Sequence, residues 1–301
     1  MKKKWLISAL VLLMLACNAL TLPLTTPTPA IVFPTFSPAD TSTPVIIAPT
    51  VGQGQIDAQS LSAVIVRMVP GPFFLLGGTQ NGEWLSPETV IPYLAAETYQ
   101  VFGMNGPGGT VEGAQPAFEE YCMAYRIETD SYPPGGRAVG VTGSWNATPR
   151  LGQEFPTDNE TYVEALRDWL VEQDIPDPVV EISQILRVDL EGDGIDEVFI
   201  SASHFVDPSG HNVGPGDYSL VLMRKVVGDS VLTIPLVADY YNQEVVNQFP
   251  LTYTATLPAD LNADGVMEVV VGVERWEGSG VMVFEIDGTT ASPVFEALCG
   301  L

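Results

Sequence analysis

The sequence predicts an α+β protein that is predominantly antiparallel β, with two four-stranded repeats and one packed helix. Two nine-residue loops of nearly the same pattern, 189–197 and 260–268, start 71 positions apart. Apolar runs rich in β-branched residues flank each loop, and such runs are typical of strands. A single segment, 157–174, has its apolar residues at helical spacing. We therefore predict a helix and two repeats over 151–301, preceded by a small α+β unit over 55–150.

Residues 1–16 have the pattern of an export signal. Lysines precede an apolar stretch that is too short to span a bilayer. The run Leu13-Met14-Leu15-Ala16-Cys17 resembles the lipobox of bacterial lipoproteins, although Leu15 stands where a small residue is usual. The resemblance implies a lipidated Cys17 and a membrane anchor. The alternative is an ordinary signal peptide that is cut near Ala16 or Ala19.

Residues 17–54 are predicted to form a disordered tether that begins at the lipidated cysteine. Threonine and proline dominate this stretch. Proline at this density opposes helices and sheets and favours an extended chain, at about 3.1 Å per residue. The N-terminal sequence therefore predicts an exported protein that is anchored on the extracytoplasmic side of a membrane.

The composition supports a folded core and argues against nucleic acid as a partner. The chain is 46% hydrophobic, and its 37 acidic residues outnumber 12 basic ones, for a formal net charge of −25. A surface of this sign repels phosphate backbones and attracts cations. We expect no nucleic-acid partner.

Two cysteines remain if Cys17 is lipidated. An even pair of cysteines outside the cytosol tends to be oxidised, which predicts a disulfide between Cys122 and Cys299. The alternative is two buried free thiols.

The unit over 55–150 carries the signals of strands, turns and a short helix. Residues 86–88 (Ser-Pro-Glu) provide a cap, a first-turn proline and an acid, and predict a helix that ends near Ala96. Glycine and proline at 103–109 predict a loop. Strands are expected at 62–69, 73–76, 98–104, 121–128 and 137–142.

The segment 157–174 is the clearest helix. Thr157 and Glu160 have the spacing of a capping box, and Pro176 ends the helical pattern. Its apolar face is formed by Tyr162, Leu166, Trp169 and Leu170. Strands of the first repeat are expected at 180–190, 197–205, 218–226 and 230–240, and those of the second at 251–260, 268–275, 280–287 and 293–298.

Both loops have the composition of a cage for a hard cation. Side-chain oxygens stand at positions 1, 3, 5 and 9, glycine at position 6 allows a sharp turn, and an apolar residue at position 7 offers its backbone carbonyl. The alternative is an acidic hairpin loop that needs no ion. The candidate ligands are Asp189, Glu191, Asp193, Ile195 and Glu197 in the first loop, and Asp260, Asn262, Asp264, Val266 and Glu268 in the second.

These loops resemble the calcium loops of FG-GAP and VCBS repeats, which form the propellers of integrin alpha subunits and occur in many bacterial surface proteins. The resemblance covers 180–301 and implies up to two bound Ca²⁺ ions in blade-like repeats. Position 9 departs from the family because it is glutamate in both copies. Two repeats are too few for a closed propeller. The longer span also resembles an uncharacterised class of secreted bacterial proteins with no known activity.

No motif in the sequence indicates a particular reaction. Neither Gly-x-Ser-x-Gly nor His-Glu-x-x-His is present. We therefore expect a non-enzymatic, calcium-stabilised binding or adhesion module on the cell surface, with a protein or glycan ligand. The alternative is a secreted, glycosidase-like hydrolase that depends on carboxylates.

Two further groups are candidates for weaker roles. Three tryptophans in loops are expected to be buried in the core, with ligand contact as the alternative. The loop 204–217 is expected to be a plain surface loop, with a His/Asp metal or acid–base site as the alternative. The tryptophans are Trp84, Trp145 and Trp276, and the loop residues are His204, Asp207, His211 and Asp217.

Overall fold

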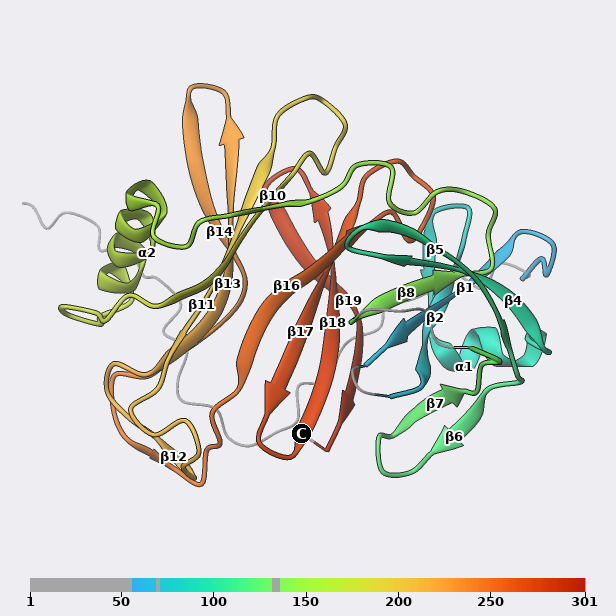
Figure 1. Ribbon diagram of the computed structural model, residues 1–301, viewed down its shortest axis with the longest axis horizontal. Coiled ribbons are helices and arrows are strands. Elements are labelled where there is room, and N and C mark those ends of the chain that lie inside the picture. The colour runs from blue at the N-terminus through green and yellow to red at the C-terminus, as the bar shows by residue number, and fades with distance from the viewer. Residues whose placement is uncertain (1–55, 69–70, 132–135, 301) are drawn as a thin grey trace, which may run out of the picture. The chain divides into compact units, whose positions relative to one another are not determined.

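The computed structural model describes residues 56–68, 71–131 and 136–300 (Figure 1). The predicted signal peptide at 1–16, the lipidated Cys17 and the tether at 17–54 lie outside the described residues. Within the described ranges the chain is mostly strand, in several antiparallel sheets of which none is closed. The predominantly antiparallel β fold that the sequence predicts is therefore confirmed.

The first sheet has eight strands and is built from 61–141, in the order β5-β4-β8-β1-β2-β7-β6 with β3 beside β2. All of its strand pairs are antiparallel. Its strands are β1 (Leu61–Arg67), β2 (Phe73–Gln80), β3 (Glu83–Leu85), β4 (Glu97–Gly103), β5 (Gly106–Gly113), β6 (Ala117–Glu119), β7 (Ala124–Ile127) and β8 (Ala138–Val141).

Two local predictions in this region are wrong. The helix expected to end near Ala96 stops after α1 (Pro87–Val90) and continues only as the 3₁₀ turn η1 (Ile91–Tyr93). Pro92 has no backbone N–H and cannot make the next α-helical hydrogen bond. The glycine-rich stretch expected to be a loop begins β5, which forms an edge hairpin with β4.

The C-terminal half contains two further sheets, and their long strands begin and end within three residues of the predicted limits. The second sheet has the order β14-β13-β11-β10-β9, and the third the order β16-β17-β18-β19. The strands are β9 (Gln153–Phe155), β10 (Ile182–Val188), β11 (Glu197–His204), β13 (Tyr218–Val227), β14 (Ser230–Tyr240), β16 (Thr252–Ala259), β17 (Glu268–Arg275), β18 (Gly278–Asp287) and β19 (Thr290–Cys299). A separate pair is formed by β12 (Asn212–Val213) and β15 (Val245–Val246).

Helix α2 (Glu160–Glu172) covers one face of the second sheet. Leu166 and Leu170 are fully buried and pack with Ile200 and Leu222 of that sheet. The helix is capped by Asn159, whose side chain accepts a hydrogen bond from the Thr161 N–H. The predicted cap at Thr157 is two residues too early, because asparagine fills the capping role equally well closer to the first turn.

The third sheet is buried on both faces. On one face Val283 packs in a cluster with Val64 of the first sheet. On the other face Phe284 packs with Phe199 of the second sheet. Adjacent residues of a strand point to opposite faces, so β18 serves both cores at once. The hydrophobic core therefore crosses the predicted division at residue 150.

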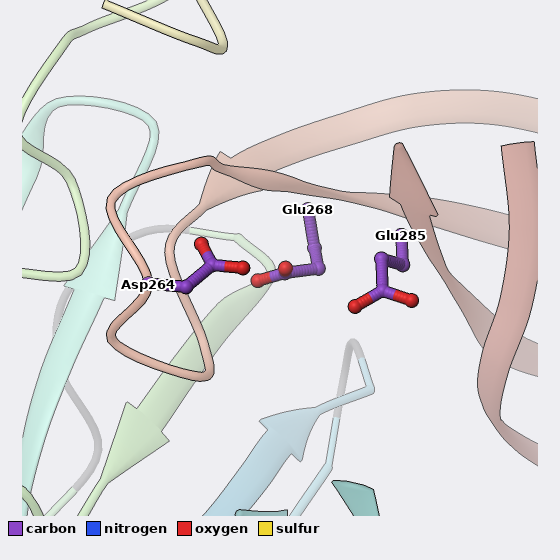
Figure 2. Close-up of side chains that lie close together, drawn as sticks. All are labelled: Asp264, Glu268 and Glu285. Carbon is purple, nitrogen blue, oxygen red and sulfur yellow. The ribbon is translucent and has the colours of Figure 1, made fainter. Parts of the chain in front are cut away.

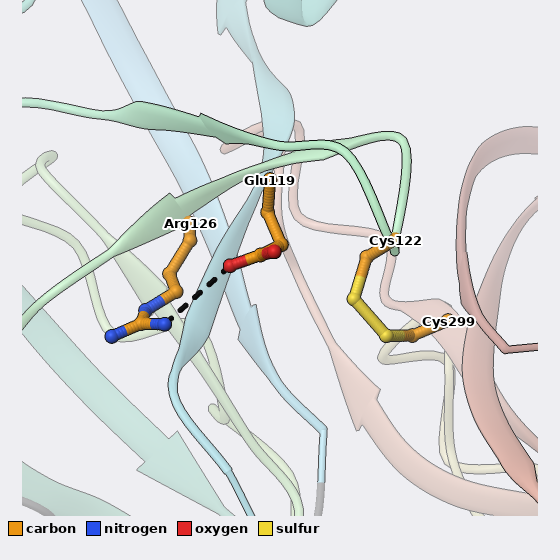
Figure 3. The surroundings of a disulfide bond; sticks show 4 residues. All are labelled: Glu119, Cys122, Arg126 and Cys299. Carbon is orange, nitrogen blue, oxygen red and sulfur yellow. Dashed lines mark hydrogen bonds and ion pairs between the residues drawn. A yellow bond between two sulfur atoms is a disulfide. The ribbon is translucent and has the colours of Figure 1, made fainter.

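Three further ties join the first sheet to the third. Cys122, in the turn between β6 and β7, forms a disulfide with Cys299 at the end of β19 (Figure 3). The Trp84 indole N–H donates to the Glu285 carboxylate over 3.0 Å. Arg137 donates to the carbonyl oxygen of Gly280 over 3.2 Å. The two parts are thus joined covalently, by apolar packing and by polar contacts.

Replacing both cysteines with serine is expected to lower the free energy of unfolding by about 2–5 kcal/mol. The reason is that the disulfide joins residues 177 positions apart and so restricts the unfolded chain. Urea unfolding of the oxidised protein measures the change. Dithiothreitol should lower the wild-type midpoint to that of the double variant and leave the variant unchanged. Equal midpoints under oxidising conditions would contradict the prediction.

Candidate metal centre

The two acidic loops lie side by side and share one arginine. The Met267 N–H donates to the Leu190 carbonyl oxygen over 3.0 Å. Arg150 donates from Nε to the Asp189 carbonyl (2.6 Å) and from Nη2 to the carbonyls of Leu190 (2.6 Å) and Gly265 (2.8 Å). Sequence reasoning missed Arg150, because it lies 39 positions before the first loop and belongs to no motif.

The aspartate at position 1 shapes the turn of each loop. Asp189 accepts hydrogen bonds from three backbone N–H groups, at Gly192, Asp193 and Gly194. Burial is the largest single effect and would raise the pKa of Asp189, but the three donors and the charge of Arg150 together outweigh it and lower that pKa below its ordinary value. Asp260 likewise accepts hydrogen bonds from backbone N–H groups of the second loop. Its deeper burial raises the pKa of the carboxyl group in spite of these bonds.

The glutamate at position 9 reaches back into its own loop. The Oε2 atom of Glu197 accepts from the Leu190 N–H over 3.0 Å, and that of Glu268 accepts from the Leu261 N–H over 2.7 Å. Both glutamates are almost fully buried, at 3% and 1% exposure. Each therefore keeps its other oxygen, Oε1, away from water, where a charge on the carboxylate needs a counter-charge and is otherwise replaced by a proton.

In the first loop that counter-charge is a lysine. The Nζ atom of Lys225 lies 3.0 Å from Oε1 of Glu197 and 2.8 Å from Oε2 of Glu191. Burial lowers the pKa of Lys225, but the two carboxylates outweigh burial and raise it. The ammonium group thus lies between two of the five predicted ligands. These residues do not fit a bound cation, because the protein supplies its own.

In the second loop the equivalent position holds another acid. Val198 pairs with Arg224 across β11 and β13, and Val269 pairs with Phe284 across β17 and β18. One step further along each ladder, Glu197 faces Lys225, whereas Glu268 faces an acid, Glu285. Sequence reasoning missed Lys225 and Glu285, because only the strand register brings them to the loops.

Three carboxylates therefore converge at the second loop. Oxygen atoms of Asp264, Glu268 and Glu285 lie within 4.8 Å of one another (Figure 2). Burial raises the pKa of Glu268 to about 9, and the charges of Asp264 and Asp260 add to this effect, while the Leu261 N–H opposes it. A hard cation with oxygen ligands would replace the proton on Glu268, so this donor set fits calcium.

The remaining predicted ligands lie on the loops but are used for backbone contacts. Asn262 accepts a hydrogen bond from the Asp264 N–H, and Asp193 and Asp264 accept from the N–H groups of the residues at position 7. Those residues are Ile195, which is exposed, and Val266, which is partly exposed.

The histidine loop does not form a common site. The Nδ1 atom of His204 lies 3.3 Å from Glu181, whereas the His211 ring lies 4.7 Å from the Phe249 ring. Asp217 is buried and accepts from two backbone N–H groups, and Asp207 accepts from the Ser209 hydroxyl. The two histidines thus have different neighbours, as expected for a plain surface loop.

The three candidate tryptophans have three different surroundings. Trp84 is buried beside Glu285, and Trp145 is partly buried and donates to the Asp260 carbonyl over 2.7 Å. Trp276 is 79% exposed. Trp84 and Trp145 therefore support the second loop, and only Trp276 is available as a surface contact among the tryptophans in the described ranges.

No family model matches this sequence, and no match to it is found among the curated proteins or the solved structures. Of the helices in 56–68, 71–131 and 136–300, none has the length and apolar character needed to cross a membrane.

Changing Lys225 to methionine is expected to lower the free energy of unfolding by roughly 3 kcal/mol, because it leaves Glu197 buried and without its counter-charge. Arg224→Met is the matched control. Arg224 is the preceding residue on the same strand and donates to the Thr233 hydroxyl, so its loss should cost no more than about 1 kcal/mol. Denaturant unfolding in EGTA compares the two. Equal losses would contradict the role of Lys225.

The stability of the calcium-free protein is expected to fall as the pH rises from 5 to 9. The folded state holds a proton on Glu268 that the unfolded state releases above its ordinary pKa of 4.5, and the stabilisation is lost as the pH rises through about 9. Glu268→Gln keeps the acceptor for Leu261 and should remove up to about 1.4 kcal/mol per pH unit from the slope. Unfolding in EGTA at several pH values measures both slopes, and parallel slopes would refute the prediction.

Proposed function

We propose that this protein is an exported, membrane-tethered, non-enzymatic binding module whose second loop binds one Ca²⁺ ion. One observation carries the calcium site: Glu285 stands at the register position where the first loop has Lys225. The sequence alone suggested up to two ions. The ion pair of Lys225 with Glu191 and Glu197 limits the proposal to the second loop.

We further propose that the two sheets of the C-terminal half are copies of one blade-like repeat of the FG-GAP and VCBS kind. In each, four strands follow one another in space and the acidic loop joins the first two. The fourth strand of each has a register shift beside a proline, at Pro235 and at Pro293. Proline lacks an N–H donor and is tolerated at such irregular edge positions. These shared irregularities support a common repeat.

The bound ion would act on stability. Asp264, Glu268 and Glu285 would hold it, and its charge would offset the repulsion among the three carboxylates. At 2 mM calcium and a dissociation constant near 0.1 mM, binding contributes about 1.8 kcal/mol to the free energy of unfolding. Such an ion would fix the loop without being required for the whole fold.

The geometry favours binding over hydrolysis. A glycosidase needs two carboxylates that flank a bond in a cleft. Among the described residues, the wall of a cavity at the C-terminal end of β17 contains a single acid, Glu277. The wall of a second cavity, beside the β4–β5 hairpin, contains none. The clustered acids lie at the loop, where Trp84 and the backbone already engage Glu285 and Glu268. The N-terminal anchor and tether that the sequence predicts would hold this module outside the cell.

Calcium is expected to raise the free energy of unfolding of the wild-type protein by about 1–2 kcal/mol relative to EGTA. Glu285→Lys copies the first loop's lysine into the second, so this variant should be stabilised in EGTA and should no longer respond to calcium. Glu191→Gln changes the first loop and should keep the full response. Differential scanning fluorimetry with calcium titration measures all three.

A wild-type protein that melts identically in EGTA and in millimolar calcium would overturn the calcium site. A calcium response that survives in Glu285→Lys would show that the ion binds elsewhere in the chain. Glu285→Gln, which keeps an acceptor for the Trp84 N–H, separates the loss of charge from the loss of that hydrogen bond.

A further inference from the structure

A cavity of about 430 Å³ lies at the opposite end of β17 from the second loop. It is lined by Ser209, His211, Phe249, Arg275, Trp276 and Glu277. The second loop meets β17 at Glu268, and Trp276 follows its last residue, Arg275. Eight residues of strand separate the two places by roughly 27 Å. The cavity is therefore distinct from the candidate metal centre.

Aromatic surface is unusually open at this cavity. Trp276 is 79% exposed and Phe249 is 37% exposed, although the other described tryptophans are buried or partly buried. The His211 ring lies 4.7 Å from the Phe249 ring, and the guanidinium carbon of Arg275 lies 5.4 Å from that ring's centre. Exposed aromatic surface of this kind around a cavity marks a contact site for a ligand.

Hydrogen-bonding groups of both kinds surround the aromatic rings. Arg275 is a donor and Glu277 an acceptor, while the Ser209 hydroxyl and the His211 imidazole can serve as either. A sugar ring has an apolar C–H face and a rim of hydroxyl groups that both donate and accept. The combination of flat aromatic faces with mixed donors and acceptors matches that chemistry.

The charge of the site favours a neutral ligand. Arg275 and Glu277 bring one charge of each sign to the cavity, so it has no excess of either. The chain as a whole has a formal net charge of −25, which repels acidic polymers. The cavity volume falls in the range typical of small-ligand sites.

The walls of the cavity are held in place before any ligand arrives. Arg275 donates to the Gly300 carbonyl over 2.6 Å, and the neighbouring Cys299 is fixed by its disulfide to Cys122. Tyr121, which is 70% exposed, lies against Gly300 and adds another aromatic ring beside this wall. A preformed site loses less conformational entropy on binding.

We propose that this cavity binds a neutral oligosaccharide, with Trp276 and Phe249 as stacking platforms. The inference rests on the proposed binding function and deepens it by naming the ligand class. His211 and Glu277 would form hydrogen bonds with the hydroxyl groups of the sugar. Arg275 would pack on the Phe249 ring and keep its hydrogen bond to the Gly300 carbonyl.

The test begins with the full-length chain and a panel of neutral oligosaccharides, namely glucose-, xylose-, mannose- and N-acetylglucosamine-based chains, with uronic-acid chains as the acidic comparison. Calorimetric titration or tryptophan fluorescence measures affinity. We expect at least one neutral saccharide to bind and Trp276→Ala to weaken it by about tenfold or more. Trp276→Phe keeps a ring and should weaken binding less, and His211→Ala should weaken it severalfold.

Two controls separate this inference from the calcium proposal. Glu285→Lys should lose the calcium response and keep saccharide affinity, while Trp276→Ala should keep the wild-type melting temperature and calcium response. No binding by any neutral saccharide would overturn the saccharide site, as would binding that is unchanged in Trp276→Ala. Tighter binding of the uronic-acid chains would overturn its neutral character. These saccharide-binding results leave the calcium site untouched, because that site is tested by the calcium response alone.

Discussion

Glu197 and Glu268 each begin a strand and reach back to accept a hydrogen bond from the N–H of the second residue of their loop. A carboxylate buried in that place needs a cation or a proton, because an unpaired charge out of water costs several kcal/mol. The chain meets this requirement in two ways. Lys225 compensates Glu197 directly, whereas Glu268 faces Glu285 and is left to a proton or a bound cation.

The arrangement of the sheets around the loops is consistent with this need of the buried glutamates for a cation or a proton. The third sheet packs against the second on one face and the first on the other, so neither face of its central strands is available to water. Arg150 and the Met267 N–H hold the two loops together through backbone carbonyls. The second loop is covered further by Trp145 and by the Asp260 N–H bond to Ala147. Its acids are therefore held close together by packing that does not depend on an ion.

The sequence predicts the local parts of this arrangement and misses those that depend on register. The long strands of the second and third sheets follow from apolar patterning, and the loops follow from their oxygen-bearing residues and glycines. Lys225 and Glu285 lie 28 and 17 positions after the glutamates they face, and only the antiparallel pairing brings them there. Local sequence patterns do not reveal that strand pairing, so the two loops look equivalent from the sequence alone. The core that the first and third sheets share was missed for the same reason. The apolar pattern of β18 predicts that its residues are buried, but it does not show which sheets they pack against.

The two ends of β17 can therefore have separate roles. An ion at the Glu268 end lies roughly 27 Å from the Trp276 turn, and over that distance the field of a surface charge is largely screened at physiological ionic strength. A mechanical effect would have to pass along a strand that is packed on both faces and so has little room to shift. The wall of the cavity is held instead by Gly300 and the nearby disulfide. Calcium would then contribute to the stability of the scaffold, and the aromatic cavity to recognition, with little coupling between them.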